Sequence, residues 1–355
     1  MVKPGTPTRR FAAILLALAL AGTACSKKSG ASGTVTLLTQ TKALLTDVIR
    51  PFTEANPKLK LDATTFLSEN DAVAKLQAGS TADVVYACVT DTHRLVTGGL
   101  IQPIDTSRLS TWGTLFPYYA NSDQIRSGGK VYIAPAFGGT TGIITNTQQV
   151  PGGVTSFKQL MEDPALAGKV TIEDNPRYGI AMGALALGMT DPYDLSDAQL
   201  GQVKDWYLAH RAQIKAFFTS GSQFESLFKN GDVIAGFGYK GSDVGLAKDN
   251  VPVAFTRASE GALTWTCGYA IGAHATNLPG AYALLNWFLS PTAQDVFATK
   301  YDQMVTNQQS LGPLAPAVRQ AIGMGDITRL DASTPTQVPA NYAAWQAAWQ
   351  AITSA

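Results

Sequence analysis

The sequence has few of the residues on which enzymes and metal proteins depend. It contains only three histidines, His93, His210 and His274, and their spacing does not match that of a metal site. The Gly-x-Ser-x-Gly turn of hydrolases, the Walker phosphate loop and the HExxH helix of zinc proteases are missing from it. We therefore predict no cofactor, no metal and no catalytic residue, and an enzyme is the weaker alternative.

Charge is also scarce, because charged residues make up only 15% of the chain whereas apolar residues make up 45%. This composition can bury large hydrophobic cores and is not typical of a disordered chain. Residues 1–24 hold three basic residues and no acidic ones, so 24 basic and 26 acidic residues remain after them, a net charge of −2. Such a balance lacks the basic surface that nucleic-acid binding requires.

The one long apolar run, residues 11–21, follows three basic residues near the start of the chain. It is too short for a permanent transmembrane helix and predicts a secretory signal. Gly22-Thr23-Ala24-Cys25 comes next and resembles the bacterial lipobox, in which the cysteine is acylated. We predict a lipoprotein signal peptide over residues 1–24 and a lipid on Cys25. Cleavage that leaves Cys25 as a free thiol is the alternative.

Small and polar residues fill residues 25–33, which predicts a flexible tether between the lipid and a folded body. The remaining chain of roughly 320 residues exceeds what one hydrophobic core usually supports, so two lobes are expected. Cys88 and Cys267 are the other two cysteines. An even pair in an exported chain is typical of a disulfide, and two buried thiols are the open alternative.

Strand and helix signals alternate along the body. Apolar, strand-like runs at residues 35–38, 59–63 and 83–87 are separated by helical patterns, and a second alternating series starts at residue 170. Two more strands are expected at residues 132–135 and 142–145, with a glycine-containing stretch between them. This order predicts an α/β fold in which each lobe has a mainly parallel sheet flanked by helices.

Seven segments resemble, in the same order, one family of transport proteins. They are residues 70–79 (NDAVAKLQAG), 82–85 (ADVV), 99–105 (GLIQPID), 137–143 (FGGTTGI), 174–177 (DNPR), 229–233 (KNGDV) and 259–265 (SEGALTW). The family is the spermidine/putrescine-type solute-binding proteins of bacterial ABC importers. The resemblance covers nearly all of the chain after the tether.

The resemblance implies a periplasmic-binding-protein fold, with two crossing strands as a hinge and the solute in a cleft between two lobes. Lobe 1 is expected over residues 34–140 and 266–311, and lobe 2 over residues 141–265 and 312–355. The protein would capture a small polar solute and deliver it to permease subunits. We expect a monomer that meets the membrane only through its lipid and faces the periplasm or the cell exterior.

The resemblance also implies which residues line the cleft. Tyr239 and Trp265 stand at family tryptophans, and Phe137 lies beside a third. Polar positions that match or replace residues of the same wall are Gln40, Thr41 and Gln303.

Most of the family's carboxylates are replaced in this sequence. Lys42 stands at a glutamate of the first loop, and Cys267 stands at the aspartate that grips a terminal amine. Asn175 and Tyr178 stand near two further acidic positions. A shift of one residue in the alignment would still bring Asp174 to the cleft. A disulfide between Cys88 and Cys267 would instead close one wall.

Two basic residues, Arg177 and Lys240, add positive charge near the expected cleft. A lost carboxylate at a buried ammonium costs on the order of a few kcal/mol of binding free energy. The replaced carboxylates therefore favour an anionic, zwitterionic or neutral solute, whereas the family resemblance favours a polyamine. Alternatively, the lysines point into solvent and Arg177 forms a structural ion pair. The sequence leaves these hypotheses open.

Overall fold

The structure is a computed structural model that describes residue 1 and residues 30–40 and 45–355. Residues 31–355 form one compact unit, and the account below concerns this body. The predicted signal peptide, Cys25, Thr41 and Lys42 lie outside the described residues. Within the described part of the chain, no helix combines the length and the apolar character that crossing a membrane requires.

One sheet of twelve strands organises the body, and a main path through it runs in the order β2-β1-β3-β12-β7-β10-β8-β9. The strands on this path are β1 (Gly33–Thr39), β2 (Leu59–Thr65), β3 (Val84–Cys88), β7 (Ala134–Asn146), β8 (Val170–Glu173), β9 (Ile214–Phe218), β10 (Ala235–Tyr239) and β12 (Leu263–Gly272). Shorter strands pair beside it: β4 (Ile101–Gln102), β11 (Val253–Thr256), β13 (Met304–Val305) and β14 (Thr334–Pro335). A separate hairpin joins β5 (Arg126–Ser127) and β6 (Lys130–Val131).

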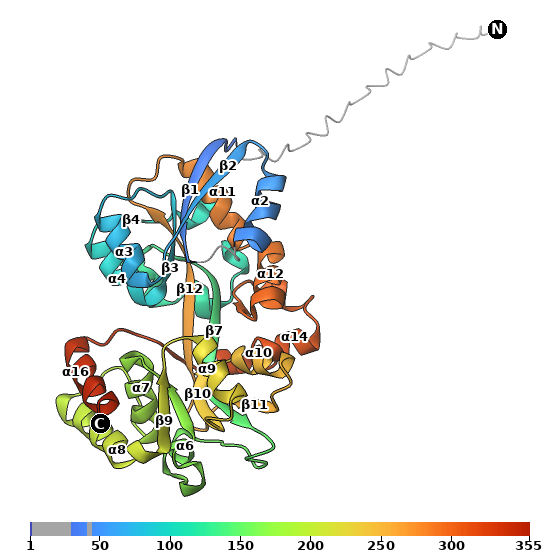
Figure 1. Ribbon diagram of the computed structural model, residues 1–355. Helices are drawn as coiled ribbons and strands as arrows, with labels where there is room; N and C mark the ends of the chain where they lie inside the picture. Colours follow the sequence, from blue (N-terminus) through green and yellow to red (C-terminus); the bar gives the residue numbers. More distant parts are fainter. Residues whose placement is uncertain (2–29, 41–44) are drawn as a thin grey trace. The chain divides into compact units, whose positions relative to one another are not determined.

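Helices surround the strands of this sheet in each of the two lobes (Figure 1). The helices that come before β8 are α2 (Arg50–Ala55), α3 (Glu69–Gln77), α4 (Thr92–Thr97), α5 (Pro117–Ala120) and α6 (Phe157–Glu162). Those between β8 and β12 are α7 (Pro176–Ala186), α8 (Asp197–Ala209), α9 (Gly221–Lys229) and α10 (Ser242–Lys248). Those after β12 are α11 (Leu278–Phe288), α12 (Pro291–Tyr301), α13 (Gln308–Leu311), α14 (Pro316–Ala321), α15 (Thr328–Asp331) and α16 (Tyr342–Thr353).

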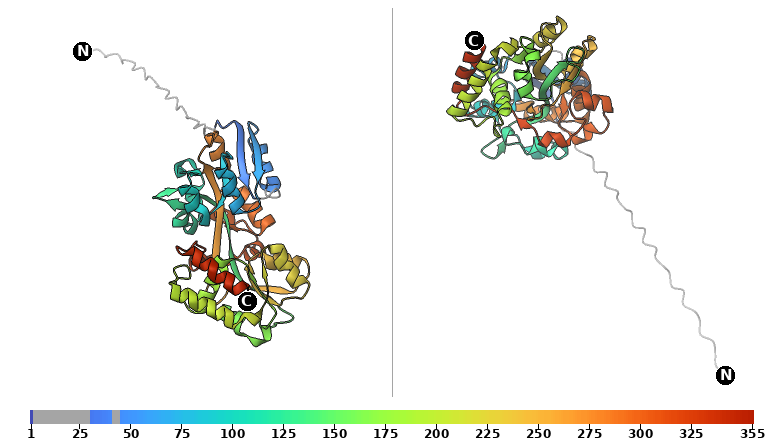
Figure 2. Two further views of the ribbon diagram at one scale, coloured as in Figure 1. Left: turned by 60° about the vertical axis from the view of Figure 1, so that its left-hand side comes forward. Right: turned by 90° about the horizontal axis from the view of Figure 1, so that it is seen from below.

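Two long strands connect the two lobes. β7 pairs with β12 and β13 through its first half and with β10 and β11 through its second half. β12 runs antiparallel to β7 and also pairs with β3. Figures 1 and 2 show both strands running from one lobe into the other. The α/β architecture with two crossing strands is therefore the predicted one.

The expectation of two separate strands around residues 137–141 is wrong, since β7 is continuous from Ala134 to Asn146. Gly138 and Gly139 are the reason. A Cβ on Gly138 would lie 2.7 Å from the Trp265 carbonyl oxygen, and one on Gly139 would lie 2.5 Å from the Trp265 ring. These glycines lie within the strand because β12 approaches so closely.

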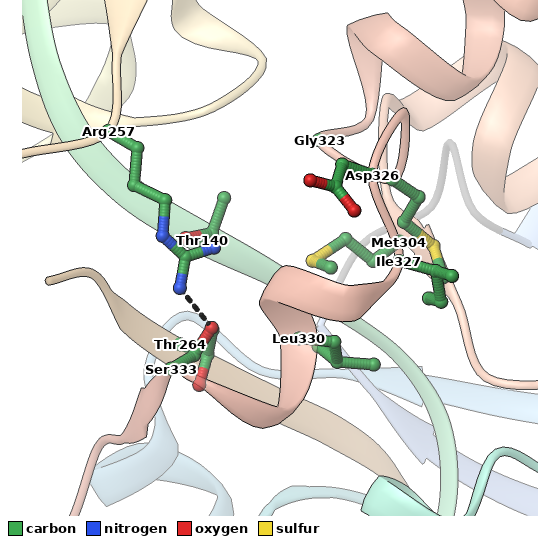
Figure 3. Close-up of a pocket in the computed structure, with 10 residues that line it drawn as sticks. Thr140, Arg257, Thr264, Met304, Gly323, Asp326, Ile327, Leu330 and Ser333 are labelled. Carbon is green, nitrogen blue, oxygen red and sulfur yellow. Dashed lines mark hydrogen bonds between the residues drawn. The ribbon is translucent and has the colours of Figure 1, made fainter.

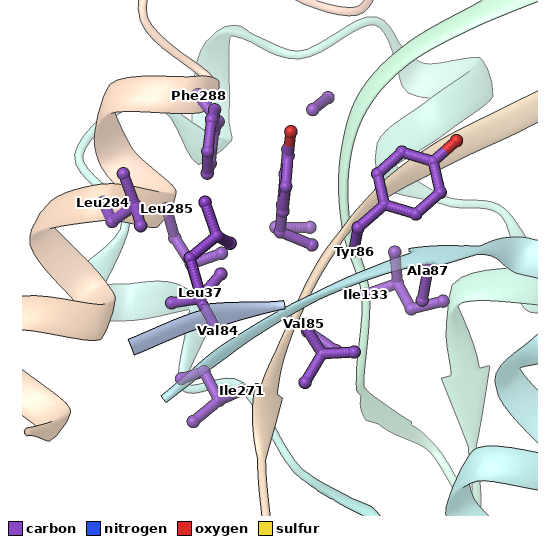
Figure 4. Close-up of a cluster of buried hydrophobic side chains, with 14 of the residues drawn as sticks. Leu37, Val84, Val85, Tyr86, Ala87, Ile133, Ile271, Leu284, Leu285 and Phe288 are labelled. Carbon is purple, nitrogen blue, oxygen red and sulfur yellow. The ribbon is translucent and has the colours of Figure 1, made fainter. Parts of the chain in front are cut away.

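Each lobe has its own hydrophobic core. One core gathers buried side chains from residues 31–137 and 267–297, and the other gathers them from residues 143–263 and 345–352. In the first core, shown in Figure 4, Leu37, Val84 and Ile271 of the strands pack beside Leu284 and Phe288 of α11. In this lobe β1 pairs in parallel with β2 and with β3. The three strands β1, β2 and β3 fall, in that order, at the predicted strands 35–38, 59–63 and 83–87.

Residues 314–330 contribute to a third cluster together with Tyr119, Ala298 and Val305. The sequence-based boundaries assign residues 312–355 to lobe 2, whereas these contacts reach residues assigned to lobe 1. The precise extent of each lobe along the chain therefore stays a prediction.

Candidate functional site

A cavity of about 790 Å³, which we call the cleft, is lined by residues that both lobes and the crossing strand β12 contribute. Its size is typical of sites for small molecules. Eight of the predicted binding residues line it: Gln40, Asn175, Arg177, Tyr178, Tyr239, Trp265, Cys267 and Gln303. Residues that are far apart in the chain thus lie together around one cavity. Their role in binding a solute stays a prediction.

Phe137 is not among the lining residues, which corrects the sequence-based expectation. Its side chain is only 6% exposed and belongs to the first core. Its ring centroid lies 4.9 Å from that of Phe297 and 6.3 Å from that of Trp265. The apolar ring is buried behind Trp265 because it has no polar group to present to a solvated cavity.

Lys240 also lies outside the cleft lining. Its ammonium group forms an ion pair with Asp243 and lies 5.3 Å from the ring centroid of Phe255. Lys240 follows the last residue of β10, and these contacts with Asp243 and Phe255 hold its side chain outside the cleft lining. The expected positive charge from Lys240 is therefore absent from this wall.

Glu173 is a cleft residue that the sequence analysis did not identify. It ends β8, and its carboxylate accepts a hydrogen bond of 2.6 Å from the Tyr239 hydroxyl. Among the described residues, no Lys or Arg nitrogen lies within 4.0 Å of this carboxylate. Burial raises the pKa of Glu173, although the Tyr239 hydrogen bond and the charge of Arg177 act against the shift. A sequence signal was present, because ligands bind at the carboxyl ends of parallel strands.

The neighbouring Asp174 faces elsewhere and is not part of the lining, so the expectation that it could reach the cleft is wrong. Its carboxylate accepts a hydrogen bond of 2.9 Å from the indole nitrogen of Trp349 on α16. The two adjacent acids therefore have different environments, since one faces the cleft and the other holds a helix of the second lobe.

Aromatic residues line the cleft together with Glu173. The rings of Tyr178 and Tyr239 lie 5.6 Å apart in an edge-to-face arrangement, and Trp265 and Tyr86 complete the wall. Burial raises the pKa of both Tyr178 and Tyr239, so the two phenols are neutral at physiological pH. Neutral aromatic faces beside a carboxylate attract organic cations through the ring quadrupole.

The floor of the cleft contains a disulfide between Cys88 on β3 and Cys267 on β12. The two cysteines stand directly opposite each other in the antiparallel pair, with their Cα atoms 3.9 Å apart. As a disulfide, Cys267 offers the cleft neither a thiolate nor the carboxylate that the family resemblance implies at this position. This part of the wall is uncharged.

An ion pair joins the two lobes at one side of the cleft. Glu69, the first residue of α3, lies 3.8 Å from the guanidinium of Arg177 in the first turn of α7. The cap of each helix fixes these positions, since the Ser68 side chain accepts from the backbone of Asp71 and that of Asn175 accepts from the backbone of Arg177. Both charged side chains also line a second cavity of about 620 Å³.

The second cavity holds another ion pair. Asp91 accepts from Arg94 at 2.8 Å, and burial together with the charge of Glu69 raises the pKa of Asp91 to about 6. This carboxylate is only 6% exposed and is already paired, so a ligand gains less from it than from Glu173.

A third cavity beside the crossing strands is too small for a solute (Figure 3). It encloses about 10 Å³, which is room for at most one water molecule. There the Arg257 guanidinium donates a hydrogen bond of 2.7 Å to the Ser333 hydroxyl, which ties the segment before α16 to the second lobe. Within residues 30–40 and 45–355, no group of three His, Cys, Asp or Glu side chains could hold a metal ion.

Two lobes, two crossing strands and a solvated cleft between them define a protein that captures a small molecule. The chain belongs to the bacterial extracellular solute-binding protein family, whose model matches residues 47–321. The resemblance found in the sequence is thereby confirmed, and the family is one of solute-binding proteins rather than of enzymes.

Individual relatives agree with this assignment. The putrescine-binding periplasmic protein PotF of Escherichia coli K12 is 29% identical over 266 residues, which cover 69% of this chain and 71% of PotF. The spermidine/putrescine-binding periplasmic protein 1 of Haemophilus influenzae is 26% identical over 297 residues, which cover 79% of this chain and 81% of that protein.

The fold of solved structures is similar as well. The spermidine/putrescine ABC transporter substrate-binding protein PotD of Streptococcus pneumoniae superposes with a TM-score of 0.81 at 17% identity. The similarity covers 91% of this chain and all of that one. At this identity the comparison shows a shared fold and not a shared ligand.

Proposed function

We propose that this protein is the substrate-binding component of an ABC importer and that it captures a small organic amine in the cleft. The observation that carries the proposal is the carboxylate of Glu173, which lies in the cleft without a basic partner among the described residues. The names of the curated relatives PotF and the Haemophilus protein, which bind polyamines, support an amine as the solute.

The environment of Glu173 suits an ammonium group. Burial raises its pKa because the carboxylate is poorly solvated, and a bound cation would restore the lost interaction. The rings of Tyr178, Tyr239 and Trp265 would contact the alkyl part of the solute and attract its charge. The Tyr239 hydroxyl already orients the carboxylate.

An anionic solute is less consistent with this cleft. Two carboxylates, those of Glu69 and Glu173, line the cleft, and Lys240, one of the two lysines on which that hypothesis rested, is held by Asp243 outside it. A zwitterionic solute is the second candidate, because Arg177 lines the cleft and its buried Nε has no hydrogen-bond acceptor among the residues that the structure describes.

Capture would proceed by closure of the two lobes around the solute. Glu173 and Tyr239 come from one lobe, whereas Gln40 and Tyr86 come from the other, so a solute that contacts both groups favours the closed arrangement. Rotation about β7 and β12 would allow this movement. The closed protein would then deliver the solute, chemically unchanged, to the permease subunits.

The protein would work outside the cytoplasm as a lipid-anchored monomer. This part of the proposal rests on the signal-like residues 1–24 and the lipobox-like Cys25. Mass spectrometry of the protein from a bacterial membrane should find a diacylglyceryl group on Cys25. An unmodified mature chain in the soluble fraction would contradict it.

A thermal-shift screen of the purified protein tests the solute class. Amines, amino acids, carboxylates and sugars are compared at equal concentration and pH, since a ligand stabilises the folded state by mass action. We expect amines to raise the unfolding temperature and simple carboxylates to leave it unchanged. Stabilisation by carboxylates alone would overturn the amine assignment, and conversion of the bound solute would overturn the transport role.

A further inference from the structure

We infer that the cleft is built for a solute with one cationic end and one neutral, hydrogen-bonding end, such as a mono-N-acylated diamine. This inference rests on the proposed amine-binding function and names the class of amine. It departs from polyamines, which carry a cation at both ends.

The charges of the described lining residues support a single cation. Only Glu69, Glu173 and Arg177 are charged among them. Glu69 and Arg177 compensate each other at 3.8 Å, whereas Glu173 has no ion-pair partner within the described residues. The described part of the cleft therefore carries one uncompensated negative charge, which one ammonium group neutralises.

A second ammonium group would have no free carboxylate. Glu69 is the other acid of the lining, and any cation that reaches it also approaches the Arg177 guanidinium. The Arg177 side chain is only 18% exposed, so water screens this repulsion less than at an open surface. Binding of a diamine would require the Glu69–Arg177 pair to separate or the second ammonium to stay unpaired, and both reduce affinity.

A carboxylate at the far end is also disfavoured. It would add a further negative charge near Glu69 and Glu173, and the Arg177 guanidinium that could receive it already compensates Glu69. A zwitterion would therefore share the single cation of the described lining with Glu69.

The remaining wall offers neutral hydrogen-bonding groups. Among the described lining residues, Gln40, Thr90 and Thr266 carry a neutral amide or hydroxyl group. Amide and hydroxyl groups can both donate and accept hydrogen bonds, and an amide on the solute has both an N–H and a carbonyl to offer them. The disulfide floor adds no charge.

Calorimetric titration of the protein with three matched series tests the inference. The series are diaminoalkanes, their mono-N-acetyl derivatives and ω-aminoalkanoates, each with three to six carbons between the functional groups, at pH 7.5 and one salt concentration. We expect the best mono-N-acetyl compound to bind at least tenfold more tightly than any member of the other two series. A diamine or an aminoalkanoate that binds as tightly would overturn the inference while leaving the amine site intact. Absence of binding throughout would refute both the amine site and the inference.

Two variants test whether the charges of Glu69 and Arg177, and not only the shape of the cleft, select the solute. Arg177→Gln frees Glu69, so diamine affinity should rise at least tenfold relative to the acetylated amine. Glu69→Gln frees Arg177, so aminoalkanoate affinity should rise by a similar factor relative to the acetylated amine. Unchanged ratios in both variants would show that the Glu69–Arg177 pair does not select the solute.

Discussion

On the second-lobe side of the cleft, the Glu173 carboxylate accepts a hydrogen bond from Tyr239, which packs against Tyr178, whereas the first-lobe side offers Gln40, Gln303 and a disulfide. The second-lobe side therefore provides a charge and aromatic faces, and the first-lobe side provides shape and neutral polar groups. We conclude that the two sides serve different ends of one solute. Changes on the second-lobe side should alter affinity most, and changes on the first-lobe side should alter selectivity or stability.

The largest effect is expected for Glu173→Gln. The substitution keeps the size of the side chain and removes the charge that an ammonium would meet in a poorly solvated place. We expect amine affinity to fall about 100-fold or more, since a hydrogen bond to a charged group in a desolvated site contributes roughly 3 kcal/mol. Calorimetric titration measures the change.

Asp174→Asn is the matched control, because it makes the same chemical change one residue further along. The amide oxygen of the new side chain can still accept from Trp349. Amine affinity should stay within twofold of the unaltered protein. An equal loss in both variants would show that general electrostatics, and not the position of Glu173, controls binding.

The crossing strands provide a second comparison, between Trp265 in the cleft and Phe137 behind it. Trp265→Leu should weaken amine binding about tenfold, since a cation over an aromatic face contributes about 1–2 kcal/mol when desolvated. Phe137→Leu should change affinity less than twofold and lower the unfolding temperature instead, because Phe137 belongs to the core. The reverse pattern would place Phe137, and not Trp265, at the solute.

Acidification should weaken amine binding because it protonates Glu173 on the second-lobe side of the cleft. Burial raises the pKa of Glu173, so this carboxylate is protonated at a higher pH than an exposed glutamate. A bound cation favours only the ionised form. Amine affinity is therefore highest above the raised pKa of Glu173 and falls by up to about tenfold per pH unit below it. Titrations between pH 4 and 8 would contradict this if affinity stayed constant.

Tyr239→Phe sharpens the pH experiment. The Tyr239 hydroxyl donates to the Glu173 carboxylate and thereby opposes the rise in its pKa. Without this hydrogen bond the loss of affinity should begin at a higher pH. An unshifted profile would show that another group controls the titration.

Among the residues that line the cleft, the smallest effect on affinity is expected for the two cysteines of the disulfide floor. Replacement of both Cys88 and Cys267 by serine should cost about 2–4 kcal/mol of folding stability, because the bond closes a long loop in the unfolded chain. Amine affinity should change less than fivefold, since the disulfide carries no charge. Thermal unfolding and titration of the same sample measure both quantities.

The alternating strand and helix pattern was sufficient to predict the parallel strands β1, β2 and β3. The fully buried β3 leaves a continuous apolar run, whereas the half-buried edge strand β2 leaves an alternating one. The continuity of β7 could not be predicted. Gly138 and Gly139 usually indicate a turn, and here they lie in a strand because the Trp265 residue of β12 packs against them. Only the tertiary structure reveals this neighbour.

In the site, the family resemblance located Tyr239 and Trp265 but directed attention to Asp174 and Asn175 for the missing charge. The end of the strand at Glu173 was the better guide, since it marks the sheet edge at which ligands bind. The register that brings Cys88 opposite Cys267 depends on pairing across 179 residues, which local sequence does not encode.

A crystal structure of the protein with its tightest-binding amine tests the central claim most directly. The account predicts that the ammonium nitrogen lies within hydrogen-bonding distance, about 2.7–3.2 Å, of a Glu173 carboxylate oxygen, with the alkyl chain between Tyr178, Tyr239 and Trp265. An ammonium bound at Asp91 in the second cavity, or a solute outside the cleft, would contradict it.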